Sequence, residues 1–395
     1  MPPPVVIAVR AWRGRENGRP DQFLTPPTDS RMDTTETISR FPPPSAPPWP
    51  LLGQERAVAI LQGALARSGV AHAYLFAGQA QSGRSTLARI FARTLNCDTP
   101  RADGAAPLAP CGLCRSCGKI ARGTHPDVRT IGLASQEAEG KTKGRRETKN
   151  TSLGIDTIRA LTTDLSLRPL EGRWRVAIVE DAETMRDEAA NAFLKTLEEP
   201  PPFAVIILIV PEIGAVLPTI RSRCQAIETK PVARDTLAAA LTTQYGVPPI
   251  DARTLAALAR GRAGWAIAAA GRPDFFTERR AVFEGMIGLL HGPAFDFFPL
   301  VDRLAERFRK GRRDEVYAEL DNWLGLWRDL LLIGGGCEEF MLNVDYAEQL
   351  RPLAARYDLA WLREAATATG DALRQLDGNV APRLALEGMI LRWQG

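Results

Sequence analysis

Residues 78–86 read GQAQSGRST, a segment with glycines at its first and sixth positions. An apolar run, AYLFA at 73–77, precedes it, and a helical pattern follows over 87–95. A strand, a glycine loop and a helix in this order are the setting in which G-x-x-x-x-G-K-[ST] forms a phosphate-binding P-loop. The stretch therefore predicts an α/β domain of the P-loop NTPase type.

One position of this loop departs from the pattern. Gly78 and Gly83 have the required spacing, and Ser85, followed by Thr86, is placed to ligate magnesium, but Arg84 stands where lysine is expected. Lysine is a compact point charge, whereas arginine carries a larger planar fork of donors. The glycines and the helix N-terminus could still hold a phosphate through backbone N–H groups. The loop therefore leaves binding of ATP and Mg²⁺ open and predicts weak or absent hydrolysis; the alternative is a P-loop fold that has lost its chemistry.

A second nucleotide motif follows a buried strand predicted at 173–179. In this motif the strand is followed by an acid that organises magnesium and then by a glutamate that polarises water. Here the order differs, because the glutamate, Glu180, comes first and Asp181 comes second. The shorter side chain then occupies the position of the base, which must come within hydrogen-bond distance of its proton. The pair predicts a degenerate magnesium site; acids that only cap the next helix are the alternative.

Four of the six cysteines have the spacing of a metal site. Three follow the pattern C-x2-C-x2-C, and the fourth lies upstream beyond a loop rich in proline, alanine and glycine. Four thiolates around one zinc ion leave no open coordination position, so such a site is structural. An iron–sulfur cluster and four unrelated thiols are the alternatives. The predicted ligands are Cys97, Cys111, Cys114 and Cys117.

Composition places the chain among soluble globular proteins. It has 395 residues, of which 45% are hydrophobic and 24% are charged, and these are ordinary values. No apolar run approaches the roughly 20 residues that cross a bilayer, and the first residues lack the order of a secretory signal. We therefore expect a cytoplasmic protein with no membrane partner. The net charge of +4 permits a nucleic-acid partner without arguing for one.

Three further segments carry information. Residues 1–48 are rich in proline without periodicity, which predicts a disordered extension. The charged run at 135–151 could touch a phosphate backbone, but its glutamates favour a solvated loop. Residues 217–224 read LPTIRSRC, and the two arginines are either surface charges or contain an arginine finger that completes a neighbour's active site. Residue types alone do not decide between these readings.

Taken together, these motifs resemble the clamp-loader family of AAA+ proteins. Beyond the P-loop and the cysteines, the resemblance rests on HAYLF at 72–76, NAFLKTLEEP at 191–200 and LPTIRSRC at 217–224. It covers about residues 50–230 and returns in NVAPRLALE at 379–387, which is similar to part of the family's C-terminal helical domain. The resemblance implies a pentameric assembly in bacterial DNA polymerase III that uses ATP to open the sliding clamp and place it on primed DNA.

The resemblance also implies roles for individual residues. The family's arginine finger lies in a Ser-Arg-Cys segment, which matches Ser222, Arg223 and Cys224 here. Arg223 would then be offered to ATP held by an adjacent ATPase subunit. The four predicted zinc ligands match the zinc module of the family.

Four departures favour a particular place within the family. The ATPase subunits gamma and tau have the P-loop lysine and an Asp-Glu pair, whereas this chain has Arg84 and Glu180-Asp181. The family has a polar sensor residue at the end of the strand near Val210, and this chain has none there. Residues 261–266 resemble the family's sensor-2 region, but Arg262 does not occupy the position of the sensor-2 arginine. These departures predict a non-motor subunit that contributes its finger in trans.

We therefore predict three domains. An AAA+ P-loop domain covers 49–230 with a zinc module inserted at 97–117, a helical lid covers 231–290, and a helical collar for oligomerisation covers 291–395.

The predicted function is to help load the sliding clamp onto primed DNA as an accessory subunit of a DNA-directed DNA polymerase. The partners would be the gamma, tau and delta subunits, with the clamp and DNA reached through the complex. One alternative is a gamma-like loader ATPase that tolerates Arg84, and another is a zinc-containing DNA-binding module with a vestigial nucleotide fold. Polymerisation itself is not expected, because no set of acids suited to two-metal chemistry is visible.

Overall fold

The structure is a computed structural model that describes residues 49–103, 106–136, 152–292, 297–378 and 380–394. The predicted extension at 1–48 and most of the charged run lie outside these residues. The described chain forms two compact units, of which one ends at Arg272 and the other begins at Pro273. The three predicted domain boundaries stay a prediction.

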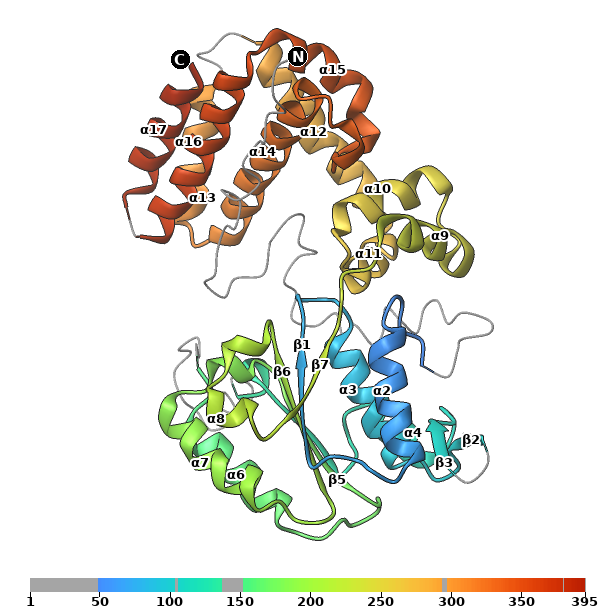
Figure 1. Ribbon diagram of the computed structural model, residues 1–395. Helices are drawn as coiled ribbons and strands as arrows, with labels where there is room; N and C mark the ends of the chain where they lie inside the picture. Colours follow the sequence, from blue (N-terminus) through green and yellow to red (C-terminus); the bar gives the residue numbers. More distant parts are fainter. Residues whose placement is uncertain (1–48, 104–105, 137–151, 293–296, 379, 395) are drawn as a thin grey trace, which may run out of the picture. The chain divides into compact units, whose positions relative to one another are not determined.

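A five-stranded parallel sheet forms the centre of the first unit (Figure 1). The central strands of this sheet are nearly continuous runs of apolar residues, as expected for strands that are covered on both faces. Neighbouring strands β1 and β6 are fully buried along their length and end together, with Ala77 paired to Val210. The strand order is β4 (Val128–Ile131), β5 (Arg175–Val179), β6 (Ala204–Val210), β1 (Ala73–Ala77) and β7 (Gln225–Glu228).

Helices cover both faces of this sheet, and the side chains of β1 show why. Because successive strand residues point to opposite faces, Tyr74 and Phe76 pack in one apolar core and Leu75 in the other. In Figure 1, α2 and α3 lie on the side of the first core, and α6 and α7 lie on the opposite side. The predicted parallel α/β domain is therefore confirmed. The bounds of these helices are Glu55–Ala66 for α2, Arg84–Leu95 for α3, Ile155–Leu165 for α6 and Asp187–Glu198 for α7.

Smaller elements complete the first unit. A hairpin and a short helix lie between α3 and β4, two 3-10 turns and a short helix flank β6, and three helices follow β7. These elements are β2 (Arg101–Asp103), β3 (Ala106–Ala109), α4 (Arg115–Ala121), η2 (Ala182–Thr184), η3 (Ile213–Ala215), α8 (Pro218–Arg221), α9 (Arg234–Tyr245), α10 (Pro249–Ala259) and α11 (Ala263–Ala270).

The second unit is helical and has one apolar core. Trp323 and Trp327 are fully buried in it with ring centroids 5.3 Å apart, as expected for packing residues. Trp361 is partly buried and stacks on Tyr357 at 4.2 Å. The elements are α12 (Phe275–His291), α13 (Phe298–Arg309), α14 (Arg313–Gly334), η5 (Glu338–Phe340), η6 (Val344–Tyr346), α15 (Ala347–Arg356), α16 (Leu359–Asp377) and α17 (Pro382–Gln394). None of the helices in the described part of the chain has both the length and the apolar composition that a bilayer crossing requires.

Candidate functional site

The P-loop connects β1 to α3, and its glycines have backbone angles that other residues rarely adopt. The φ angles of Gly78 and Gly83 are +149° and +102°. A Cβ at Gly78 would lie 2.1 Å from Oγ1 of Thr229, so only glycine fits there. Because α3 begins at Arg84, its first N–H groups have no acceptor within the helix. A helix N-terminus of this kind favours an anion.

Contacts within the protein hold this loop in shape. The hydroxyls of Ser82 and Thr229 lie 2.6 Å apart. The Nε2 of Gln54 donates to the carbonyls of Ser82 at 3.4 Å and Lys230 at 2.7 Å. On the other side, the N–H of Gly264 at the start of α11 donates to the carbonyl of Gln81 at 3.0 Å. The loop is therefore fastened to the end of β7 and to α11 by its own chain.

A cavity of about 280 Å³ lies between the P-loop, α3 and α11. This volume lies just below the range of about 300–1,000 Å³ that is typical of ligand pockets. The cavity brings most of the predicted nucleotide residues together, although Gly78 and Asp181 do not line it. Its lining residues are Gln81, Gly83, Arg84, Ser85, Thr86, Arg89, Glu180, Gly264, Ile267 and Ala268.

The guanidinium of Arg84 is engaged with groups of its own chain. Its Nη1 donates to the carbonyl of Val210 at the end of β6. Burial lowers the pKa of Arg84, and the negative charges of Glu183, Asp181 and Glu180 act in the opposite direction. The acids after β5 thus offset part of the cost of burying the charge of Arg84, and its donors are partly used by a strand end.

The two predicted acids are also held by other groups. Glu180 forms an ion pair with Arg89 at 3.6 Å. Asp181 has a φ of +54°, and its Oδ2 accepts a hydrogen bond from the N–H of Leu133 at 3.2 Å. The side chain in the position of the base is therefore tied to the segment after β4.

Sequence reasoning missed a third acid, Glu183. Burial raises the pKa of this carboxyl, Asp181 raises it further, and Arg84 acts in the opposite direction. Its Oε2 is buried and has no hydrogen-bond partner among the described residues. The signal was present in the sequence, because Glu183 completes the run EDAE at 180–183.

The two sensor positions agree with the departures seen in the sequence. Strand β6 ends at Val210, which is apolar. Arg262 is buried with its guanidinium 5.7 Å from the ring centroid of Trp265, and its Nε donates to the carbonyl of Ala259 at 3.0 Å. Arg262 does not line the cavity between the P-loop and α11.

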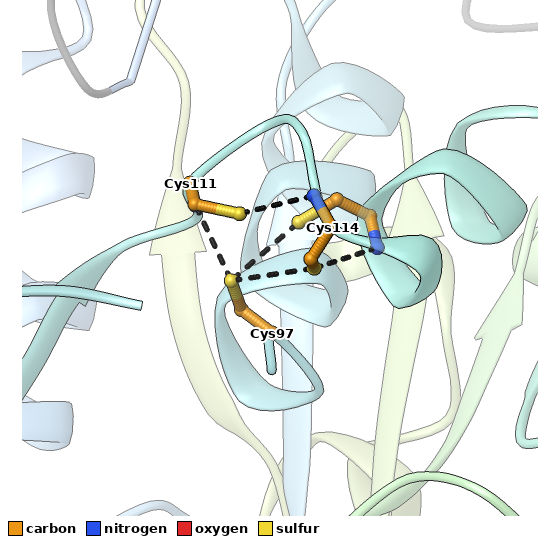
Figure 2. Close-up of side chains that lie close together, drawn as sticks. Cys97, Cys111 and Cys114 are labelled. Carbon is orange, nitrogen blue, oxygen red and sulfur yellow. Dashed lines mark hydrogen bonds between the residues drawn. The ribbon is translucent and has the colours of Figure 1, made fainter. Parts of the chain in front are cut away.

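The four cysteines of the predicted metal site lie together, and all their sulfur atoms are within 4.8 Å of one another. Figure 2 shows the sulfurs of Cys97, Cys111 and Cys114 directed toward a common point. The Sγ of Cys97 lies 3.8 Å from that of Cys114 and 3.6 Å from that of Cys117. Four sulfurs bound to one tetrahedral zinc at 2.3 Å would be about 3.8 Å apart. The cluster therefore fits a single metal ion.

Hydrogen-bond donors around the cluster favour thiolate ligands, whereas burial disfavours them. Backbone N–H groups point at the sulfurs, for example from Cys111 to Cys97 at 3.3 Å and from Cys117 to Cys114 at 3.4 Å. A hydrogen bond from Thr99 lowers the pKa of Cys111 to about 6, and burial raises that of Cys97 to about 12. His125 is not among these ligands, because its Nε2 lies 2.8 Å from the hydroxyl of Ser116.

The Ser-Arg-Cys segment follows α8 and divides between surface and core. Arg223 is 35% exposed, and its Nη1 donates to the carbonyl of Thr219 at 2.9 Å. Ser222 Oγ lies 3.3 Å from the same Nη1. Cys224 packs against an apolar core, and burial raises its pKa to about 12. A contact that the sequence did not suggest joins Arg223 Nη2 to Glu198 Oε1 at 2.6 Å.

Comparison with known proteins agrees with these features. The family model for the DNA polymerase III delta subunit matches residues 53–233. A delta prime subunit of DNA polymerase III from Bacillus subtilis is 28% identical over 347 residues, which cover 86% of this chain and 96% of that protein. A delta prime subunit from Pseudomonas aeruginosa is 39% identical over 158 residues, 40% of this chain and 43% of that protein.

A gamma/tau subunit of DNA polymerase III from Mycobacterium tuberculosis is also similar. It is 30% identical over 374 residues, which cover 87% of this chain and 60% of that protein. The resemblance to clamp-loader subunits of DNA polymerase III, and to delta prime in particular, is therefore confirmed.

Proposed function

We propose that this chain acts as a delta prime subunit of the DNA polymerase III clamp loader. It would help to load the sliding clamp onto primed DNA and would supply Arg223 to ATP bound by a neighbouring ATPase subunit. The observation that carries the proposal is the contrast between two arginines. Arg84 is engaged with Val210 and the acids of its own P-loop site, whereas Arg223 lies in the segment after α8 with 35% of its side chain exposed.

The role of Arg223 follows from the chemistry of phosphoryl transfer. Negative charge accumulates on the transferred phosphoryl group, and a planar guanidinium can donate two hydrogen bonds to it. Ser222 and Cys224 would not touch the phosphate. Ser222 contacts the guanidinium, and the partly buried Cys224 anchors the segment to the core.

The chain's own hydrolysis would be weak or absent. A base must reach the proton of the attacking water, but the carboxylate of Asp181 is bonded to the N–H of Leu133. Glu180 is paired with Arg89. The proposed partners are the gamma, tau and delta subunits, with the clamp and primed DNA reached through the assembled loader.

We infer that the four cysteines hold a structural Zn²⁺ ion. When bound, zinc would supply a cross-link between the end of α3, the segment after β3 and α4. Thiolates would fill all four positions of a tetrahedral site, which leaves none for a substrate. Cys114 also caps α4, since its sulfur accepts the N–H of Cys117, so the ligands belong to the local fold.

Replacement of Arg223 tests the proposed finger. In a loader reconstituted with the Arg223→Ala chain, we expect the DNA-stimulated ATPase to fall at least about threefold, because one ATP site loses a charge that stabilises its transition state. Assembly, followed by size-exclusion chromatography, should be unchanged. Arg221→Ala is the matched control, because Arg221 is an exposed arginine of the same segment. An unchanged rate with Arg223→Ala would contradict the finger.

A gamma-like ATPase is the second candidate, and the retained P-loop geometry favours it. The angles of Gly78 and Gly83 and the free start of α3 are those of a phosphate cradle. Robust ATP turnover by the purified chain, abolished by Arg84→Ala, would replace the first proposal with this one.

A further inference from the structure

We propose that Glu198 is a positioning residue for Arg223, which it holds in the orientation required to reach a phosphate on a neighbouring subunit. The inference rests on the proposed finger role of Arg223. It adds a second residue from a different helix, α7, to that function.

The guanidinium of Arg223 is held at two of its three nitrogens. Nη2 donates to Glu198 Oε1 at 2.6 Å, and Nη1 contacts both the carbonyl of Thr219 at 2.9 Å and the hydroxyl of Ser222 at 3.3 Å. A guanidinium carries five N–H donors. Three contacts leave two donors for phosphate oxygens, so the arrangement orients the fork without saturating it.

The fold fixes both partners of this pair. Glu198 is the last residue of α7 and follows Leu197, which is buried in the same core as Ile220 of α8. Arg223 is likewise followed by Cys224, which packs against this core. Because each charged residue adjoins a residue anchored in one core, the distance between carboxylate and guanidinium is set by the packing of α7 on α8.

The ion pair between Glu198 and Arg223 contributes little to stability. Its effect is to hold the guanidinium of Arg223 in one orientation. Both side chains are partly exposed, at 49% for Glu198 and 35% for Arg223, and exposed ion pairs are weak. A free arginine has many rotamers, and a group that must meet a transition state gains from being placed in advance. Loss of Glu198 should therefore leave the fold intact and slow the chemical step.

The experiment compares substitutions in the assembled loader with steady-state, DNA-stimulated ATPase as the readout. Glu198→Ala should lower kcat about threefold, and by no more than Arg223→Ala does, with KM for ATP unchanged. Glu198→Gln should keep most of the activity, because its amide oxygen accepts the same hydrogen bond. Glu199→Ala, the neighbouring carboxylate with no hydrogen bond to Arg223 in the described contacts, should be silent. In an Arg223→Ala background, Glu198→Ala should add nothing.

Each other outcome is decisive. If Arg223→Ala lowers kcat and Glu198→Ala does not, the positioning role is wrong while the finger stands. A rise in kcat for Glu198→Ala would mean that Glu198 restrains the arginine, and the inference fails. A further loss in the Arg223→Ala background, or an equal loss with Glu199→Ala, would mean a general structural effect. If Arg223→Ala has no effect, the proposed function fails and the positioning role fails with it.

Discussion

At the scale of single residues, two arginines of one chain have different environments because their neighbours differ. Arg84 stands at the start of α3, where the ends of β5 and β6 supply three acids and a carbonyl. Arg223 stands outside the sheet, where only Glu198, Ser222 and Thr219 contact its guanidinium in the described structure. Arg84 contacts groups of its own site, and Arg223 keeps two N–H donors for another molecule.

Replacement of Arg84 tests the first half of this contrast. Arg84→Lys should tighten binding of ATP with Mg²⁺ by about tenfold or more, because a shorter ammonium releases the carbonyl of Val210 and presents a point charge to the outer phosphates. Isothermal titration of the full chain measures the affinity. Hydrolysis should stay weak, since Asp181 remains bonded to Leu133.

The control for this change is Arg89→Lys, which also keeps a positive charge in the cavity but alters the partner of Glu180. It should leave the affinity unchanged. Equal affinity of the Arg84→Lys and original chains for ATP would show that Arg84 does not limit nucleotide binding. The proposed difference in role between Arg84 and Arg223 would then be wrong.

Sequence patterns reach some of these residues and not others. The spacing of Gly78 and Gly83 predicts the loop, because glycine is the residue that readily adopts the positive φ angles found at both positions. The partners of Arg84 and Arg223 could not be predicted in this way. Val210 lies 126 positions from Arg84 and Glu198 lies 25 from Arg223, so each contact depends on which way a flexible side chain turns within the folded domain.

At the scale of elements, the cysteine cluster lies where the end of α3, the segment after β3 and α4 come together. The predicted loop between Cys97 and Cys111 contains the hairpin of β2 and β3. The sequence predicts a loop here, and the structure has a hairpin. Tertiary contacts explain the hairpin, because the indole N–H of Trp49 donates to the carbonyl of Leu108 at 2.7 Å and β3 packs on α2. Cysteine spacing predicts the cluster because the ligands are local, but the hairpin depends on a distant tryptophan.

The module is also fastened to the edge of the sheet. The hydroxyl of Ser116 in α4 contacts His125 at 2.8 Å, just before β4. Burial alone would raise the pKa of nearby Asp127, but three backbone N–H groups at 170–172 and the charge of Arg175 lower it below its usual value. The stability that this carboxylate contributes is therefore present above its unfolded pKa and is lost as pH falls through the depressed one.

Removal of one cysteine tests the metal site. The purified chain should contain one zinc per molecule, and Cys117→Ser should abolish it and lower the thermal midpoint of the first unit by about 10 °C, because a structural site couples metal binding to folding. Metal analysis by mass spectrometry and calorimetry measure the two effects. Cys337→Ser, a cysteine outside the cluster, should change neither. Retention of zinc by Cys117→Ser would contradict the four-ligand site.

At the scale of the whole chain, the two units divide the work that the proposed function requires. The first carries a P-loop whose charges are balanced internally and an arginine offered outward. The second has a single core of six helices and no counterpart of this chemistry among its described residues. A subunit that acts on a neighbour's ATP must be held beside that neighbour, and we propose that the helical unit does so.

The last helix offers a surface for this assembly. Leu384 and Leu391 of α17 are 64% and 58% exposed, although Leu386 and Ile390 between them are fully buried. Residues seven apart lie on the same face of a helix, so the two leucines form one outward apolar stripe. We propose that these two leucines, with Glu387 and Gly388 between them on the same face, contact another protein in the assembly.

Charge placed on this stripe should therefore prevent assembly without unfolding the chain. We expect Leu384→Glu combined with Leu391→Glu to weaken incorporation into the reconstituted loader at least about tenfold, because a buried carboxylate without a partner is costly at an interface. Native mass measurement of the complex gives the incorporation, and circular dichroism checks that the helices remain. Ile250→Glu on α10, where the side chain is 72% exposed, is the matched control and should assemble normally. If the double variant assembles as the original chain does, α17 does not hold the subunits together, and the contact that brings Arg223 to its neighbour must be sought on the first unit.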